Sequence, residues 1–249
     1  MSFQAATGEA NQVEFTESGL TFRDPKSTIK AGTGCTAKNP HEVSCTRPAD
    51  LTRVEIDLLD GDDRVTLNTT ALPSDVRGDA GDDEIVGGAA RDEVLAGSGS
   101  DRVMLGAGDD RLFASDQSEA LAPDVYDGGE GNDEVDYGTH SAGVTINLAD
   151  PAAPSGEAGE GDSLTAFENA FGSGRDDVIV GSAAGNVINA WTGNDRVEGG
   201  DGGDQIRGHD GNDRIYGGNG RDVATVDAGK DRVSKYIARV KALPPATSC

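Results

Sequence analysis

The chain has 249 residues, of which 36 are glycine and only 4% are aromatic, so large side chains are too scarce for a thick two-layer core. Its formal net charge of −24, from 45 acidic and 21 basic residues, argues against nucleic acid or an anionic membrane surface as a partner. The sequence contains no run of 18 apolar residues, so no membrane span is predicted.

Residues 1–57 are predicted to form a β cap. Apolar and polar side chains alternate in Val13-Glu14-Phe15, Leu20-Thr21-Phe22 and Val54-Glu55-Ile56, as in strands with one buried face. Because a solenoid exposes the open edge of its last coil, such a cap is expected at its start.

Cys35 and Cys45 lie in this cap and bracket a short polar loop. Their spacing suits a disulfide formed in an oxidising compartment, with metal binding by the two thiolates as the alternative. The chain begins Met1-Ser2-Phe3-Gln4 without a signal peptide, which we interpret as an artificial start on a chain whose leader was removed. We therefore expect a secreted, extracellular protein.

Residues 58–136 are predicted to form a first repeat block. Its nonapeptides carry an acidic residue at position six and an apolar residue at position eight, a period that a disordered acidic tract would not keep. A copy with Asp63 and a degenerate copy with Ser74 precede four copies in phase from Gly78, and two more copies follow a five-residue slip. The later position-six residues are Asp83, Asp92, Asp101, Asp110, Asp124 and Asp133.

Residues 137–171 interrupt the period. The alternating stretch from Val144 to Leu148 predicts a strand. We interpret the segment as a β-rich insert that caps one block and starts the next, and one continuous solenoid with a bulged coil is the alternative.

Residues 172–234 are predicted to form a second block of seven nonapeptides without a gap. Its position-six residues are Asp177, Asn186, Asp195, Asp204, Asp213, Asp222 and Asp231. Residues 235–249 are predicted to be a tail that closes the last coil, with a secretion signal as the alternative, and Cys249 is expected to be a free or intermolecular thiol.

Each nonapeptide divides into a glycine-rich loop and a short strand. In the strand, the position-eight side chain is expected to point inward and positions seven and nine outward. In the loop, glycines permit tight turns that direct peptide carbonyls to one point, where position six adds a carboxylate. Ca²⁺ takes six to eight oxygen ligands, so one loop supplies too few. If two nonapeptides make one turn, loops 18 residues apart stack and complete the shell.

The copies GGDGGDQIR and GHDGNDRIY resemble the G-G-x-G-x-D-x-U-x repeat of RTX, or hemolysin-type, calcium-binding proteins. The resemblance implies an all-β fold, a parallel β-roll or right-handed β-solenoid. It also implies that each ion takes the carbonyls of positions two and four and the Asp of one repeat. The other ligands are the carbonyls of positions one and three and the Asp of the repeat two further on.

Carried onto this sequence, the resemblance implies three well-formed sites. The first comprises Gly200, Gly202 and Asp204 with Gly217, Asn219 and Asp222. The second comprises Trp191, Gly193 and Asp195 with Gly208, Asp210 and Asp213. The third comprises His209, Gly211 and Asp213 with Val226, Ala228 and Asp231.

Other sites are expected to be weaker. Arg175, Ala184 and Ala90 replace glycine at position four, and Asn186 replaces an Asp. Upstream, the best candidates are the pairs Asp83 with Asp101 and Asp92 with Asp110, whereas pairs that cross the slips at 67–77 and 114–118 are doubtful. We expect several Ca²⁺ ions, roughly five to nine.

No catalytic motif is evident, so no enzymatic activity is predicted. The sequence His41-Glu42-Val43-Ser44-Cys45 lacks the second histidine of a zinc-protease helix, and no G-x-S-x-G elbow occurs. His41, His140 and His209 are expected at the surface. The predicted function is a scaffold that folds on binding calcium; a cell-surface or glycan-binding module, or the non-catalytic part of a secreted hydrolase, is the alternative.

Overall fold

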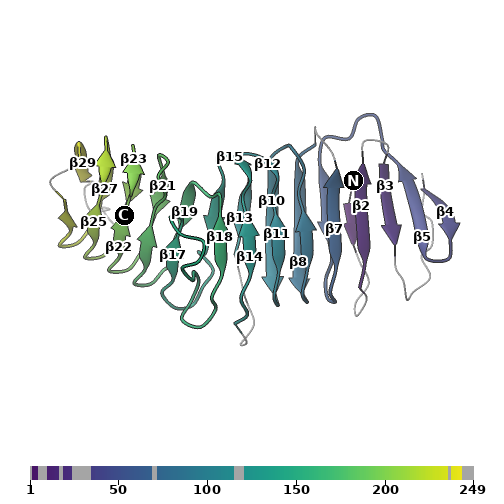
Figure 1. The fold of residues 1–249 in the computed structure, drawn as a ribbon, viewed down its shortest axis with the longest axis horizontal. Helices are drawn as coiled ribbons and strands as arrows, with labels where there is room; N and C mark the ends of the chain where they lie inside the picture. Colours follow the sequence, from purple (N-terminus) through teal and green to yellow (C-terminus); the bar gives the residue numbers. More distant parts are fainter. Residues whose placement is uncertain are drawn as a thin grey trace, which may run out of the picture. The chain divides into compact units, whose positions relative to one another are not determined.

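The computed structural model describes residues 2–4, 10–16, 19–23, 35–68, 72–114, 121–234 and 237–242. These residues form strands and loops only, and none of them belongs to a helix that could cross a membrane. The chain divides into two compact units, Met1–Asp133 and Glu134–Cys249. In each unit, short parallel strands stack coil upon coil, so the predicted all-β parallel β-roll is confirmed (Figure 1).

The first unit has two main sheets. One runs in the order β1 (Ser2–Gln4), β6 (Val54–Asp57), β8 (Ser74–Ala80), β10 (Asp92–Ser98) and β13 (Arg111–Phe113), with all neighbours parallel. The other has parallel strands β14 (Val125–Asp127), β11 (Arg102–Met104), β9 (Glu84–Val86), β7 (Arg64–Asn68) and β2 (Gln12–Thr16). A small parallel pair, β12 (Ala107–Gly108) and β15 (Glu130–Gly131), joins two loops.

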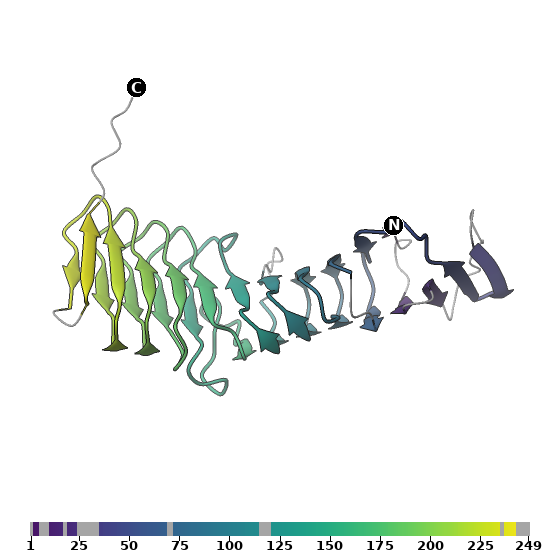
Figure 2. The ribbon, with the colours of Figure 1, turned by 90° about the horizontal axis from the view of Figure 1, so that it is seen from above.

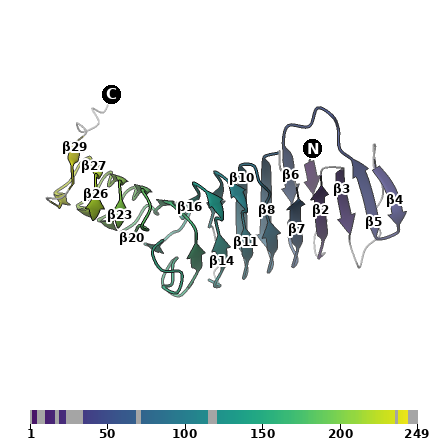
Figure 3. The same ribbon diagram turned by 45° about the horizontal axis from the view of Figure 1, so that its top comes forward.

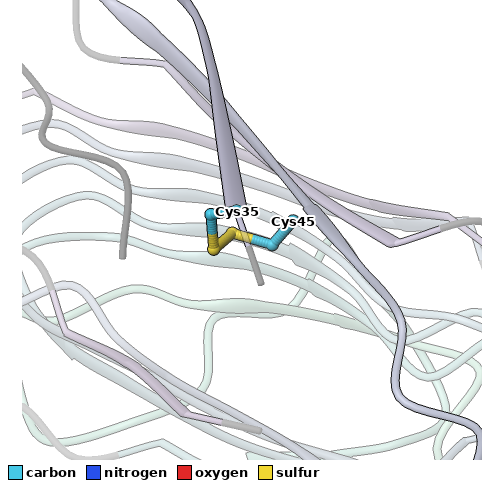
Figure 4. The surroundings of a disulfide bond; sticks show 2 residues. All are labelled: Cys35 and Cys45. Carbon is cyan, nitrogen blue, oxygen red and sulfur yellow. A yellow bond between two sulfur atoms is a disulfide. The ribbon is translucent and has the colours of Figure 1, made fainter. Parts of the chain in front are cut away.

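The second sheet of this unit continues from β2 into an antiparallel meander of β3 (Gly19–Arg23), β5 (Glu42–Thr46) and β4 (Cys35–Asn39). Cys35 and Cys45 face each other across β4 and β5 and are joined by a disulfide, as predicted (Figure 4). The crosslink fixes the outermost strand pair of the meander. Cys249 lies outside the described residues.

The second unit repeats this arrangement, and Figure 2 shows its coils from above. One sheet comprises β16 (Glu134–Asp136), β19 (Asn169–Phe171), β21 (Val187–Asn189), β24 (Gln205–Arg207), β27 (Val223–Val226) and β29 (Arg239–Ala242). The other comprises β17 (Thr145–Asn147), β20 (Val178–Val180), β22 (Arg196–Glu198), β25 (Arg214–Tyr216) and β28 (Arg232–Val233). A short strand, β18 (Ser163–Thr165), and the loop pair β23 (Asp201–Gly202) and β26 (Asn219–Gly220) complete the unit; Figure 1 labels β18, and Figure 3 labels β23 and β26.

Strand pairing follows an 18-residue register, so two nonapeptides make one turn. Ile179 lies beside Val197, and Val197 lies beside Ile215. On the other sheet, Ile188 lies beside Ile206. All five side chains are at most 1% exposed. The predicted inward direction of position eight is therefore confirmed, and each of these coils contributes only about two aliphatic side chains to a thin core.

The segment 137–171 supplies strands to both sheets of the second unit. Ile146 in β17 pairs with Ile179, and Ala170 in β19 pairs with Ile188. The alternating stretch predicted as a strand is therefore β17. Residues 148–162 form a long loop between β17 and β18.

Candidate metal sites

The position-six residues form ladders in which each backbone is tied to the next coil. The N–H of Asp204 donates to Oδ1 of Asp222 (3.1 Å), and the N–H of Asp195 donates to Oδ1 of Asp213 (3.0 Å). The same bond joins Asp83 to Asp101, Asp92 to Asp110, Asp177 to Asp195, Asn186 to Asp204 and Asp213 to Asp231. The ladders therefore bring the predicted Asp pairs together at both edges of the rolls.

The ladders also cross both slips. The N–H of Asp101 donates to Oδ1 of Asp124 (2.7 Å), and that of Asp110 donates to Oδ1 of Asp133 (2.9 Å), each over 23 residues. The bond from Asp63 to Asp83 spans 20 residues. Pairs that cross the slips, doubtful from the sequence alone, thus keep the same hydrogen bond between coils. Residues 69–71 and 115–120, within these slips, lie outside the described residues.

Each position-six residue is one rung of a ladder. At many rungs the second carboxylate oxygen, Oδ2, is buried without a hydrogen bond. Such an atom is costly, because it has lost water and gained no partner. A cation beside it would restore the lost interaction, so these oxygens fit a metal ion. The described residues with a buried, unbonded Oδ2 of this kind include Asp63, Asp83, Asp110, Asp195, Asp204, Asp213 and Asp222.

At other rungs, every side-chain oxygen accepts a hydrogen bond from the protein. Oδ1 of Asp177 accepts hydrogen bonds from Val144 N–H and Ser173 Oγ, and its Oδ2 accepts from Ser173 N–H. Oδ1 of Asn186 accepts from Ser182 N–H. Asp92 is satisfied in the same way by Ser74 and Gly88, and Tyr126 donates to Oδ2 of Asp124. These positions therefore provide fewer unbonded oxygens for a metal ion than those of the first group.

Burial also raises the pKa of several carboxylates of the ladder. Loss of solvent raises the pKa of Asp83 to about 8 and the pKa of Asp110 and Asp195 to about 7. It raises the pKa of Asp63 and Asp213 to about 6. Backbone hydrogen bonds oppose the shift, and carboxylates of adjacent rungs add to it. The ladder thus holds negative charge poorly unless a cation accompanies it.

Position-one glycines leave the space beside these oxygens open. A Cβ on Gly199 would lie 2.3 Å from Oδ2 of Asp204 and 2.4 Å from the carbonyl oxygen of Gly217. Both atoms belong to the first predicted site, so the structure brings a carboxylate and a carbonyl of two coils to one place. A Cβ on Gly208 or Gly217 would likewise meet its own Asp, at 2.4 and 2.3 Å.

The loops before these carboxylates have the backbone that the repeat requires. In the first site, Gly200 and Gly202 have φ of 101° and 110°. Trp191 and His209 occupy the same repeat position as Gly200, position two, and also have positive φ, 68° and 62°. In the second and third sites, Gly193 and Gly211 have φ of 149° and 153°.

Three of the predicted carbonyl ligands already accept backbone hydrogen bonds. Gly200 accepts from Asn219 (2.9 Å), Asp210 from Gly193 (3.0 Å), and Ala228 from Gly211 (3.0 Å). Each carbonyl keeps a second lone pair for an ion.

The third predicted site is the least regular. The sequence places Val226 in a loop, but in the structure it ends β27 and pairs with Ala242 of β29. Its repeat has no glycine at position one or two, and β-branched Val226 extends the strand. Asp231 is only partly buried. This site is therefore less enclosed than the first two.

Carboxylates alone do not complete a site. Across the described ranges, no three side chains of His, Cys, Asp and Glu gather so that they could hold a metal. Any ion between two rungs must therefore take backbone carbonyls as well, and this is the kind of mixed oxygen shell that Ca²⁺ accepts.

A second ladder, at position five, was missed by the sequence reasoning. Asn194 N–H donates to Oδ1 of Asp176, Asn212 N–H to Oδ1 of Asn194, and Lys230 N–H to Oδ1 of Asn212. These bonds run opposite to those of position six, because here the earlier side chain accepts from the later backbone. The signal was the recurrence of Asp and Asn at position five of the second block.

The three histidines have different environments. His41 is exposed, whereas the His209 side chain is 37% exposed with Nδ1 at 3.3 Å from Oδ2 of Asp227. His140 is buried, with Nε2 at 3.1 Å from Oε1 of Glu160, so the expected surface position is wrong for it. Burial lowers the pKa of His140, but Glu160 more than compensates and the net shift is upward. The sequence hid this pair because its partners are 20 residues apart.

Comparison with known proteins agrees with this geometry. A family model described as the RTX calcium-binding nonapeptide repeat (4 copies) matches residues 77–113, 171–206 and 198–233. No curated protein matches the chain. The matched ranges contain the rungs Asp83, Asp110, Asp195, Asp204, Asp213 and Asp222, all with an unbonded oxygen.

Proposed function

The chain carries RTX calcium-binding nonapeptide repeats that form a calcium-binding β-roll, and from this premise we propose that it is a secreted, non-catalytic module that folds when it binds calcium. The observation that carries the proposal is the set of buried Oδ2 atoms without a hydrogen bond. In a roll with so thin a core, leaving these oxygens unpaired would offset much of the hydrophobic gain.

Three groups of atoms of the chain contribute to folding in different ways. Position-eight side chains bury apolar surface, Oδ1 atoms tie successive coils, and Oδ2 atoms with loop carbonyls are left to hold ions. Bound Ca²⁺ supplies the positive charge that offsets repulsion between rungs. Because the ligands converge only in the stacked coils, binding and folding are coupled.

Circular dichroism of the full chain tests the proposal. In EDTA we expect little strand signal, and after addition of a few millimolar Ca²⁺ we expect the strand spectrum to appear. Mg²⁺ at the same concentration is the control, since its strict octahedral shell fits a mixed loop site poorly. A strand signal of equal size in EDTA and in calcium would refute calcium-dependent folding.

Two features support the extracellular and non-catalytic parts of the proposal. The Cys35–Cys45 disulfide suits an oxidising compartment, and proteins with RTX repeats are typically secreted. The sequence lacks known nucleophile and zinc-protease motifs, and buried His140 is engaged by Glu160. Extracellular modules of this kind bind Ca²⁺ with dissociation constants of about 10⁻⁴–10⁻³ M. An extracellular calcium concentration on the order of millimolar would then act as the folding signal.

A further inference from the structure

One sheet face of the second unit carries a row of arginines. On β22, β25 and β28, Arg196 lies beside Arg214 and Arg214 beside Arg232. All three are exposed, because position seven points away from the core. Neighbouring strands are about 4.8 Å apart, so the three cations form one column across the sheet.

Only one arginine of this row has a carboxylate partner among the described residues. Arg196 binds Glu198 and lies over the ring of Tyr216, 5.5 Å from its centre. Among the described residues, no carboxylate lies within 4.0 Å of Arg214 or Arg232. Like charges on directly opposed strand positions destabilise a sheet. In a chain of net charge −24, two adjacent unpaired cations point to an anionic partner.

Exposed aromatic side chains occur on the same coils. Tyr216 is 44% exposed at the end of β25, and Trp191, the only tryptophan of the chain, is 50% exposed in the loop before β22. Flat aromatic rings contact sugar rings well, and the guanidinium fork matches carboxylate and sulfate groups. Together these side chains provide the chemistry that recognises an acidic sugar polymer.

We propose that the arginine face, defined as Arg196, Arg214, Arg232 and Tyr216, binds a linear polysaccharide that carries carboxylate or sulfate groups. A single polymer chain can contact the row of arginines alone. A DNA duplex or a lipid bilayer presents a wider anionic surface, which exposed loop carboxylates such as Asp176, Asp201 and Asp210 would repel. The face exists only in the folded roll, so this inference rests on the proposed calcium-dependent folding.

The test measures binding of the full chain, in calcium, to immobilised hyaluronan and chondroitin sulfate, with neutral dextran as the blank. The double variant R214Q/R232Q should weaken binding at least about tenfold, because it removes two charge-assisted contacts. The matched control R207Q/R221Q removes the same charge from two exposed arginines, on β24 and in a loop, and should bind like wild type. Tyr216→Ala should also weaken binding.

Circular dichroism in calcium, recorded first for every variant, separates loss of the face from failure of the roll to fold. R214Q/R232Q relieves a like-charge contact and should fold as wild type does. The proposal is overturned if the folded wild type binds neither polysaccharide, if both double variants lose affinity equally, or if duplex DNA or phosphatidylserine vesicles bind more tightly than the polysaccharides.

Discussion

The two oxygens of a position-six carboxylate have separate tasks. Oδ1 accepts the backbone N–H of the previous coil, as Asp213 does from Asp195, whereas Oδ2 of Asp213 is buried without a partner. Where position two is Ser173, its N–H and hydroxyl occupy the carboxylate of Asp177 instead. Neighbouring donors, such as Ser173 here or Tyr126 beside Asp124, therefore decide whether a rung is available to an ion.

Asp213→Asn tests the task of Oδ2. The amide keeps an oxygen for the rung but loses the charge, and Asp213 serves two predicted sites. We expect the apparent calcium affinity to fall roughly tenfold, with at least one ion fewer bound, since a contact to a charged group contributes about 1.5 kcal/mol or more. Isothermal titration calorimetry measures both quantities.

Asp210→Asn is the matched control for this variant. It removes the same charge from the same loop, but only the Asp210 carbonyl is a predicted ligand. Its calcium stoichiometry should equal that of wild type. If both variants changed binding equally, the effect would be one of net charge and not of Oδ2.

Gly199→Ala tests the space beside Asp204. Gly199 does not have a positive φ, so alanine brings no backbone strain, but its Cβ would fall 2.3 Å from Oδ2 of Asp204. Crowding of this kind costs about 1–3 kcal/mol, so the calcium concentration at half-folding should rise severalfold or more. Gly203→Ala in the same loop would place its Cβ 3.5 Å from its nearest neighbour and should leave the midpoint unchanged. Equal midpoints for the two variants would contradict the placement of the site.

At the scale of the element, the strands followed from the nine-residue period. Position eight points inward because side chains alternate along a strand. Because two nonapeptides make one turn, Ile179 lies beside Val197, which is 18 residues later in the chain. The period could not show which oxygens lack partners. That depends on individual donors: Ser173 and Ser182 donate to position six of their own nonapeptide, and Ser74 donates to Asp92 of the next coil.

The slips and the position-five ladder escaped sequence reasoning for a related reason. An insertion breaks the nine-residue phase in the sequence, yet β11 and β14 on either side of it stay paired, and the N–H of Asp101 still donates to Oδ1 of Asp124. Asn194 resembled a solvated loop residue, yet its side chain bonds to the coils on both sides.

Asn194→Ala tests the position-five ladder. The variant loses the two hydrogen bonds that Asn194 Oδ1 accepts from the N–H and Nδ2 of Asn212, and the one that its Nδ2 donates to Oδ1 of Asp176. Because these groups are exposed, we expect a loss of about 1 kcal/mol in the free energy of unfolding, measured by urea in saturating calcium. Thr192→Ala, which removes one hydroxyl bond of the same loop, should cost less. A loss no larger than that of Thr192→Ala would show that the ladder contributes little.

The raised pKa values of the ladder predict how the metal-free roll responds to pH. The folded pKa of Asp83 is about 8 and that of Asp195 about 7, both above the unfolded value near 3.9. The folded state therefore holds more protons, and its stability falls as pH rises through this window. In EDTA, the strand signal should grow as the pH is lowered from about 8 to about 5.

Calcium should reverse the direction of this pH dependence. Protons compete with the ion for the same carboxylates, so apparent calcium affinity should rise with pH over that range. Circular dichroism at fixed pH values, with and without calcium, measures both trends. Loss of strand signal on acidification in EDTA would contradict the environment assigned to the ladder.

For the whole molecule, stability depends on more than hydrophobic burial. Each coil of the second block buries about two small aliphatic side chains, the chain has 4% aromatic residues, and its charge of −24 opposes compaction. The disulfide joins β4 to β5 alone and is remote in sequence from the second block. In the proposed function, bound calcium would contact the unpaired oxygens and neutralise part of the charge.

Hydrogen exchange of the full chain, resolved by peptide, tests calcium-dependent folding most directly. In calcium, we predict strong protection of the strands β20 to β28, and in EDTA we predict loss of that protection together across these strands. The β4–β5 hairpin, crosslinked by Cys35–Cys45, is the internal reference, because its pairing uses no predicted calcium ligand. Equal protection of β20 to β28 in EDTA and in calcium would contradict the account.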